Sequence, residues 1–334
     1  MLTRIIRHLG LAMLVVTALA AGTIAAEGTE VGGHATLAPG DYSFTVKHDG
    51  AERSYLVHMP PQAGGGAPLA VVLNLHGAGS NGKQQEKYSQ MDAAADRDGF
   101  IAVYPNGSSR FSDHLTWNAG FCCAYAMTHR IDDVGFVLAL IDDLAARTPI
   151  QARQVYATGL SNGAMLSYRL AAQASTHIAA IAPVAGTMVV KNFFPRHPMP
   201  IMAFNSVDDP YVRYDGQVGS AVASLFGRGG GRPGIEKMLA KWREFDHCPE
   251  QPRVSPTLSG KPGTTDQGHT ATRYAWGPCN NDTEVVLWKL TGSGHVWPGG
   301  IHDALPHVLG GGTSLIDANE EMWRFFRQFK LPAQ

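Results

Sequence analysis

The stretch Gly159-Leu160-Ser161-Asn162-Gly163 decides the fold, because it sets a serine between two glycines where two predicted elements meet. A strand is predicted before it at 154–158, and a helix after it at 163–174. A sharp strand-to-helix turn lifts the serine hydroxyl out of the sheet, and glycine on both sides leaves room for that turn. The context predicts a nucleophile elbow, with Ser161 as the nucleophile and the helix N-terminus aimed at the reacting centre.

Strands and helices alternate around this elbow. Apolar runs at 69–75 and 100–104 predict buried strands. The remaining strands are expected at 178–182, 200–205 and 284–290, and the remaining helices at 84–98, 134–147, 235–246 and 317–329. Alternating segments at 42–48 and 53–59, joined by Asp49-Gly50, predict an antiparallel hairpin at a sheet edge. The expected fold class is therefore α/β, with a mostly parallel central sheet, helices on both faces and an N-terminal antiparallel hairpin.

Composition and charge narrow the function classes. The chain has 334 residues, of which 44% are apolar, as suits a globular protein with a sizeable core. The formal net charge is −1, so the basic footprint of a nucleic-acid-binding protein is missing. The sequence has no internal repeat and no Pro- or Ser/Thr-rich linker. Residues 26–334 are therefore expected to form a single catalytic domain, as a monomer or a small homo-oligomer.

The first residues have the pattern of a secretory signal. Arg4 and Arg7 give a positive start, residues 9–19 are apolar, and Thr23-Ile24-Ala25 offers a cleavage site. A membrane anchor is the alternative, but the apolar run is shorter than the ~20 residues that span a bilayer. No other segment is long and apolar enough to span. We expect residues 1–25 to be a signal peptide and the protein to be secreted or periplasmic.

Four cysteines remain after this segment, and an oxidising compartment favours disulfides. Their spacing suggests a disulfide between Cys248 and Cys279. Cys122 and Cys123 are neighbours, which can join only in a strained ring, stay free, or each pair elsewhere. The cysteine spacing fits no usual zinc pattern, so we expect no metal site.

A serine nucleophile needs a base and an acid, which follow it along the chain in folds with this elbow. His295 lies in a Gly-rich loop, 292–300, after the late apolar strand, which suits a histidine that reaches over the nucleophile. The acid should follow an intermediate strand, as Asp208 and Asp209 both do. Either could orient the imidazole, and sequence alone scarcely separates them. Asp215 is a weaker third candidate.

Ester cleavage also needs N–H donors for the developing oxyanion. One is expected to be the backbone N–H of Asn162, the residue after the nucleophile. The loop His76-Gly77-Ala78-Gly79-Ser80 follows an early strand, and its N–H at Ala78 is the favoured second donor. The alternative is a phosphate-binding loop, but no lysine follows in the required spacing.

Three aromatic residues near these loops are candidates for substrate binding. Trp117 and Trp297 lie in Gly- and Asn-containing loops rather than in amphipathic stripes, and could stack on an aromatic or sugar-like group. His76 begins the proposed oxyanion loop. The alternative for both tryptophans is ordinary packing. The Gly- and Arg-rich segment 227–234 could be a lid or an exposed loop.

These residues together resemble a known family. The chain is similar to the secreted esterases that join polyhydroxybutyrate depolymerases to feruloyl and acetylxylan esterases, and the similarity runs over most of the chain after the signal. The matching segments are Arg53-Ser54-Tyr55 leading to Pro60, Leu75-His76-Gly77, Gly99-Phe100 leading to Tyr104-Pro105, Trp117-Asn118-Ala119-Gly120, Asp132-Asp133-Val134-Gly135-Phe136, residues 159–165, Asp209-Pro210 leading to Tyr214, and Gly294-His295-Val296-Trp297-Pro298-Gly299. The resemblance implies an α/β-hydrolase fold with no metal and no organic cofactor.

The resemblance also separates the two candidate acids. The family's acid stands directly before proline in a pattern like D-P-x-V-P-Y, which the segment from Asp209 to Tyr214 matches, so Asp209 is preferred to Asp208. The sequence departs from the pattern at Arg213, where the family usually has proline. It also has Asn205-Ser206 where His-Gly is common.

The expected function is a serine carboxylic-ester hydrolase that acts through an acyl-enzyme on polymer-linked or aromatic esters. The segment Ser161-Asn162-Gly163-Ala164-Met165 looks more like the feruloyl-esterase side of the family than the depolymerase side. Dedicated polyester depolymerases usually carry a polymer-binding domain after a linker, and this chain shows none, which disfavours attack on crystalline polymer. A peptidase or amidase on the same fold, or a non-enzymatic secreted binding protein, are the alternatives.

Overall fold

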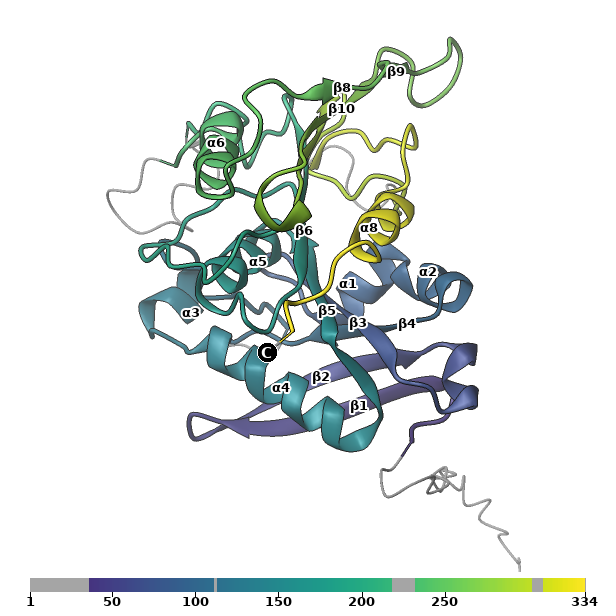
Figure 1. Ribbon diagram of the computed structural model, residues 1–334, viewed down its shortest axis with the longest axis vertical. Helices are drawn as coiled ribbons and strands as arrows, with labels where there is room; N and C mark the ends of the chain where they lie inside the picture. Colours follow the sequence, from purple (N-terminus) through teal and green to yellow (C-terminus); the bar gives the residue numbers. More distant parts are fainter. Residues whose placement is uncertain (1–35, 111–112, 218–231, 302–308, 334) are drawn as a thin grey trace, which may run out of the picture.

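In the computed structural model, the described residues are 36–110, 113–217, 232–301 and 309–333. They form one continuous sheet in the order β1-β2-β4-β3-β5-β6-β7-β11-β10-β8, with β9 paired to β10 (Figure 1). The strands are β1 (Gly40–His48), β2 (Ala51–Met59), β3 (Leu69–Leu75), β4 (Phe100–Pro105), β5 (Ile150–Leu160), β6 (Ala180–Val184), β7 (Ile201–Ser206), β8 (Arg253–Val254), β9 (Leu258–Ser259), β10 (Thr270–Trp276) and β11 (Val285–Thr291). The run from β4 to β11 is parallel throughout. The predicted α/β class, with a mostly parallel sheet, is confirmed.

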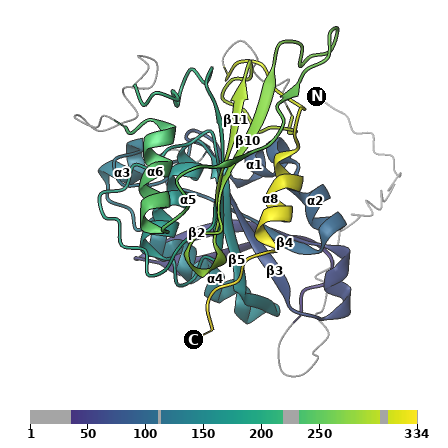
Figure 2. The same cartoon turned by 45° about the horizontal axis from the view of Figure 1, so that its top comes forward.

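Helices cover both faces of the sheet, as Figure 2 shows. One layer contains α3 (Ala124–Thr128), α4 (Asp133–Arg147), α5 (Asn162–Gln173) and α6 (Ile235–Phe245). The other contains α1 (Gly82–Ser89), α2 (Met91–Asp98) and α8 (Ala318–Phe326). Two short 3₁₀ helices, Pro61–Gly65 and Asn280–Asp282, lie in connections. Each layer buries its own apolar cluster against the sheet, so neither face is left open to water.

The N-terminal hairpin is where the sequence placed it. β1 and β2 pair antiparallel, with His48 opposite Ala51 across the turn at Asp49-Gly50. Both turn residues have positive φ, 49° and 74°, as a tight hairpin turn requires. β1 forms one edge of the sheet, and β2 joins the hairpin to β4.

One predicted element was wrong in detail, and one strand was missed. The single helix expected at 84–98 is two helices, because Gln90 adopts the left-handed conformation, φ 54° and ψ 32°, and ends α1. The antiparallel strand β10 was not predicted at all. It pairs with β11 at the end of the sheet opposite the hairpin, where its side chains are only partly buried and give no clear apolar run.

The predicted disulfide between Cys248 and Cys279 is confirmed. It joins the loop after α6 to the connection before β11. The structure also joins Cys122 to Cys123, so of the three possibilities left open the pairing of neighbours is the one adopted. Both of these neighbouring cysteines are buried.

Some sequence predictions lie outside the described residues. The expected signal peptide, 1–25, is among them, as is most of the Gly- and Arg-rich segment 227–234. Within the described part of the chain, none of the helices combines the length and the apolar character that crossing a bilayer requires.

A buried carboxyl group makes the stability of the fold depend on pH. Asp246, at the end of α6, is fully buried; one carboxylate oxygen accepts the N–H of Met199 at 3.2 Å, and the other has no hydrogen-bond partner. Burial raises the pKa of this carboxyl to about 7, against the smaller opposing effect of the Met199 hydrogen bond. The folded state therefore holds a proton that the unfolded chain has already released above pH ~4.

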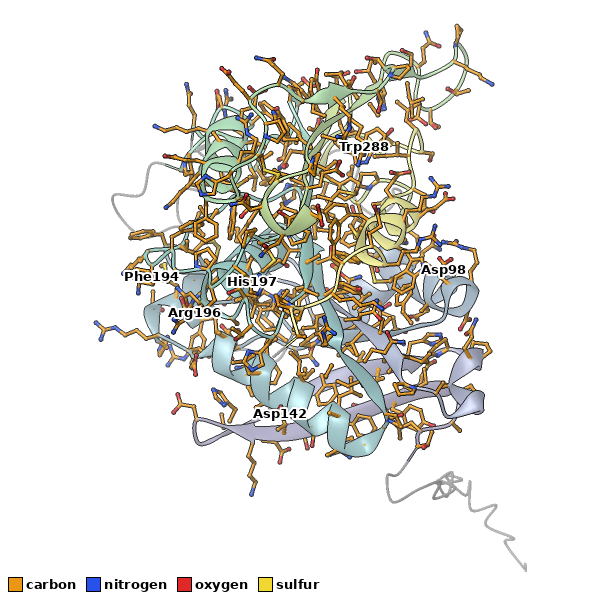
Figure 3. The ribbon with its side chains drawn as sticks, in the orientation of Figure 1. Asp98, Asp142, Phe194, Arg196, His197 and Trp288 are labelled. Atoms are coloured by element: carbon orange, nitrogen blue, oxygen red, sulfur yellow. A yellow bond between two sulfur atoms is a disulfide. The ribbon has the colours of Figure 1, made fainter. Side chains whose placement is uncertain are left out.

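We expect the free energy of unfolding to fall as pH rises from about 4 to about 7, and then to lose this dependence. Asp246→Asn keeps the acceptor for Met199 without the charge, so it should be more stable than wild type at pH 8 by roughly 2 kcal/mol. Urea unfolding at pH 5 and pH 8 measures this. Asp142→Asn, an exposed carboxyl on α4 (Figure 3), is the matched control and should change stability equally at both pH values. An equal effect of Asp246→Asn at both would contradict the assignment.

Candidate active site

The candidate site gathers at the carboxyl ends of the parallel strands. The loop at 76–80 follows β3, Ser161 follows β5, Asp209 follows β7 and His295 follows β11. Since these strands are parallel, their carboxyl ends lie along one edge of the sheet, where open α/β sheets bind ligands.

Ser161 sits on a turn that only the flanking glycines permit. Its φ of 56° and ψ of −113° are strained for a residue with a side chain, and its N–H donates to Val184 O at 2.9 Å. A Cβ on Gly159 would lie 2.4 Å from Leu75 O, and one on Gly163 would lie 2.1 Å from the same atom. The glycines are needed because β5 and α5 cross directly against the end of β3. The elbow geometry that the sequence indicated is therefore present.

Asp209 and His295 form a close pair, although 86 residues separate them. His295 Nδ1 lies 2.7 Å from Asp209 Oδ2, and both side chains are buried. The other carboxylate oxygen, Oδ1, accepts the N–H groups of Tyr211 and Val212 at 2.8 and 2.9 Å. Because the carboxylate only accepts, Nδ1 carries the proton, and Nε2 is left with its lone pair free for a proton from a nucleophile.

The two rejected acids have other contacts. Asp208 Oδ2 accepts the N–H of Gly292 at 2.7 Å, so this side chain supports the start of the loop that carries the histidine. Asp215 is exposed and pairs with Arg213, with 2.8 Å between Arg213 Nη2 and Asp215 Oδ2. Of the candidate acids, only Asp209 contacts His295.

Ser161 and His295 both line one cavity of about 630 Å³. Gly77, Ala78 and Ser80, from the predicted oxyanion loop, line it as well. A Cβ on Gly77 would lie 3.6 Å from Ser161 Cβ, so this loop passes directly beside the serine. The other lining residues are Gly79, Gln84, Gln85, Lys87, Tyr88, Leu160, Ile301 and Leu309. The cavity wall is mainly apolar in area, and its polar side chains are those of Ser80, Ser161, His295 and the lining residues of α1.

The structure corrects the prediction of the three aromatic substrate-binding residues. His76, Trp117 and Trp297 are all buried and none lines the cavity, so none can contact a substrate there. His76 Nδ1 donates to Gly77 O at 2.8 Å and its Nε2 accepts the N–H of Gly107 at 3.0 Å. Burial lowers the pKa of this imidazole to about 4, so it is neutral at pH 7. These residues stabilise the loops and do not contact a substrate in the cavity.

A hydrogen-bonded link that the sequence did not reveal joins the elbow to the oxyanion loop. The side chain of Asn162 accepts the N–H of Trp117 at 2.7 Å and donates to Trp117 O at 3.1 Å. The indole of Trp117 in turn donates to His76 O at 2.9 Å. Trp117 therefore bridges the residue after Ser161 and the strand end that leads into Ala78. The sequence motif marked Asn162 for its backbone only, and its side chain gave no signal.

Removing this link should slow the chemical step. Trp117→Phe keeps a buried ring but deletes the donor to His76 O, and the loop carrying the Ala78 N–H should lose its exact placement. We expect kcat for ester hydrolysis to fall about tenfold with KM within about twofold, since misplaced groups weaken transition-state binding more than substrate binding. Steady-state kinetics on a 4-nitrophenyl ester measures this.

Trp242→Phe is the matched control, because the indole nitrogen of Trp242 is buried without a hydrogen-bond partner. It should leave kcat within about twofold. Equal losses in both variants would assign the effect of Trp117→Phe to packing alone.

Among the described residues, Asp41, His58 and Asp92 bring three possible metal-ligand atoms within reach of one another. They lie on β1, β2 and α2, outside the catalytic cavity. Both nitrogens of His58 are already paired, with Asp41 at 2.7 Å and Asp96 at 2.8 Å. This group is therefore a satisfied surface ion-pair network.

The fold and the site geometry define the class: an α/β-hydrolase with a serine on the elbow and, in the same cavity, a histidine paired with an aspartate. A family model described as esterase PHB depolymerase matches residues 53–227, which is more than half of the chain. The chain belongs to this esterase family.

Individual relatives agree with that membership. The chain is 28% identical to the bifunctional acetylxylan esterase/xylanase XynS20E of Neocallimastix patriciarum over 75% of its own length, and 25% identical to feruloyl esterase B of Piromyces equi over 84%. It spans only 32% and 46% of those proteins. The solved acetyl xylan esterase from Aspergillus awamori is 14% identical, with a TM-score of 0.54 over 86% of this chain and 99% of that one, which shows a shared fold.

Proposed function

We propose that this protein is a serine carboxylic-ester hydrolase that works through an acyl-enzyme. The observation that carries the proposal is the 2.7 Å pair between His295 Nδ1 and Asp209 Oδ2 at the cavity where Ser161 stands on its strained turn. Membership of an esterase family supports the ester bond as the target.

In the first half of the reaction, Ser161 Oγ attacks the ester carbonyl carbon while His295 Nε2 takes the hydroxyl proton. Asp209 holds the imidazole in the required tautomer and stabilises the imidazolium that forms. The tetrahedral intermediate then collapses, and the alcohol leaves with the proton from Nε2. The products of this half are the free alcohol and an ester between Ser161 and the acyl group.

The second half repeats the chemistry with water as nucleophile. His295 takes a proton from water, the hydroxide attacks the acyl-enzyme carbonyl, and Ser161 leaves with the proton returned by Nε2. In both halves the negative charge develops on the former carbonyl oxygen. The backbone N–H groups of Asn162, at the start of α5, and of Ala78 are the proposed donors to it.

The proposed substrates are polymer-linked or aromatic esters, of the feruloyl-esterase or polyester type. The cavity supports this, because Leu160, Ile301 and Leu309 give it an apolar wall beside the serine. The names of the two relatives, one a bifunctional acetylxylan esterase/xylanase and one a feruloyl esterase, support an ester substrate of this kind.

A panel of four substrates tests the proposal: methyl ferulate, acetylated xylan, amorphous polyhydroxybutyrate and 4-nitrophenyl butyrate. We expect hydrolysis of the nitrophenyl ester and of at least one of the three others, and the best of them names the branch of the family. Turnover of 4-nitroanilide amides faster than of every ester would contradict the ester assignment.

We also propose export, with removal of residues 1–25. The N-terminal pattern and the Cys248–Cys279 disulfide support it, because disulfides persist in oxidising compartments. The intact mass of the mature protein from a native-like secreting host tests the cleavage. A retained N-terminus would contradict it.

A further inference from the structure

Helix α1 separates two cavities, and its two lysines face different ones. Lys83 lines a shallow cavity on the β1–β2 side, where its Nζ lies 2.6 Å from Glu86 Oε1. Lys87, one turn later, lines the catalytic cavity together with Gln84 and Tyr88.

Lys87 has no ion pair or hydrogen bond to any described residue. The described lining of the catalytic cavity contains no carboxylate, and its ionisable groups are Lys87, Tyr88 and His295. Tyr88 is neutral, since burial raises the pKa of its phenol above the usual value. Asp209 is buried behind His295 and has its own hydrogen bonds. Among the described residues, the exposed ammonium of Lys87 is therefore a positive charge in this cavity with no carboxylate paired to it.

Apolar side chains line the same cavity as this charge and the proposed nucleophile. Leu160, Ile301 and Leu309 line the same cavity that holds Ser161 and Lys87. A ligand that uses all of these groups has a reactive ester for the serine, an apolar stretch for the leucine and isoleucine side chains, and an anionic group for Lys87. A neutral ester uses the first two features only.

We infer that Lys87 is a specificity-determining residue that favours esters carrying a second, ionised carboxylate, such as half-esters of dicarboxylic acids or oligoesters with a free acid end. The inference rests on the proposed function, because it concerns the substrate of the same site. Every interior cut in a polyester chain leaves a fragment with a carboxylate end. Reactions that open such chains would therefore supply substrates of this class.

The test compares a neutral ester with two anionic ones of similar length. The neutral ester is 4-nitrophenyl octanoate; mono-4-nitrophenyl suberate carries its carboxylate on the acyl side, and 4-nitro-3-octanoyloxybenzoic acid carries it on the alcohol side. We expect Lys87→Gln to lower kcat/KM for at least one anionic ester about three- to fivefold, which is the size of effect expected for one exposed ion pair. The kcat/KM of the neutral ester should stay within about 1.5-fold of wild type. The preference of the wild type for that anionic ester over the neutral one should also shrink as salt is raised from 20 to 500 mM.

Lys83→Gln is the matched control, one helical turn away and paired with Glu86, and should change none of the three rates. Lys87→Glu should lower kcat/KM for the affected anionic ester further than Lys87→Gln does, because it repels the carboxylate. The inference is overturned if Lys87→Gln affects neither anionic ester, or affects all three esters equally. If either outcome is found while the wild type hydrolyses the neutral ester normally, the proposed function stays intact. If the wild type hydrolyses none of the three esters, the proposed function itself is contradicted.

Discussion

Ser161→Ala is expected to reduce kcat for 4-nitrophenyl butyrate by about 10⁴- to 10⁶-fold, because it removes the hydroxyl that we propose forms the acyl-enzyme. The residual rate would come from the donors at the oxyanion position, which remain in place. The strained turn should survive, since alanine has the same Cβ as serine and the flanking glycines are untouched. Initial rates with purified variant and wild type measure the loss.

A second measurement identifies the atom. One equivalent of a fluorophosphonate should attach to the wild type, which mass spectrometry should locate on the peptide that contains Ser161. No label should attach to Ser161→Ala. Ser167→Ala is the matched control, because Ser167 is a buried serine on the same helix whose hydroxyl donates to Gly163 O at 3.1 Å. It should keep its label and its rate within about threefold. Wild-type turnover by Ser161→Ala would show that another group is the nucleophile.

Asp209→Asn is expected to lower kcat at pH 7 by about 10³- to 10⁴-fold, with little change in stability. The amide oxygen can still accept the N–H groups of Tyr211 and Val212, so the turn is kept. The amide nitrogen would then face His295 and donate to Nδ1, which moves the imidazole proton to Nε2. That tautomer cannot accept the proton of Ser161.

The neighbouring acid gives the contrast. Asp208→Asn keeps an acceptor for Gly292 N–H and touches neither His295 nor the cavity lining, so it should hold kcat within about threefold. Paired kinetics on the two variants, with thermal unfolding as the folding check, separates the acids. Comparable losses of kcat in both variants would contradict the assignment of Asp209. A larger loss in Asp208→Asn would assign the role to Asp208 instead.

The serine elbow and the parallel strands could be predicted from the sequence, because the local chemistry there is strict. Only glycine fits beside Ser161, because a Cβ at either position meets the carbonyl oxygen of Leu75. The apolar runs of the parallel strands are equally plain, since both faces of the sheet are covered. The choice of Asp209 over Asp208 needed the family resemblance, because both residues follow the same strand and no local sequence pattern distinguishes them.

Other features depended on contacts between distant segments. Nothing near Trp117 in the sequence indicates that its main chain is held by Asn162, 45 residues away. Tryptophan in a Gly-rich loop suggested a stacking surface, yet this one is buried and supports the loop behind the serine. Lys87 stood in a helix with ordinary surface composition, and only its position at the cavity made it a candidate for specificity.

The side-chain contacts of Asn162, together with the proposed role of its backbone N–H, have a consequence for how this protein could be diversified. A residue that contributes to a reaction through its peptide N–H alone can usually be exchanged freely in a mutant library. Here the same residue also fastens the main chain of Trp117 through its amide. Libraries that randomise this position should therefore lose most of their active members, and directed evolution of new ester preferences has more room in the wall formed by Ile301 and Leu309.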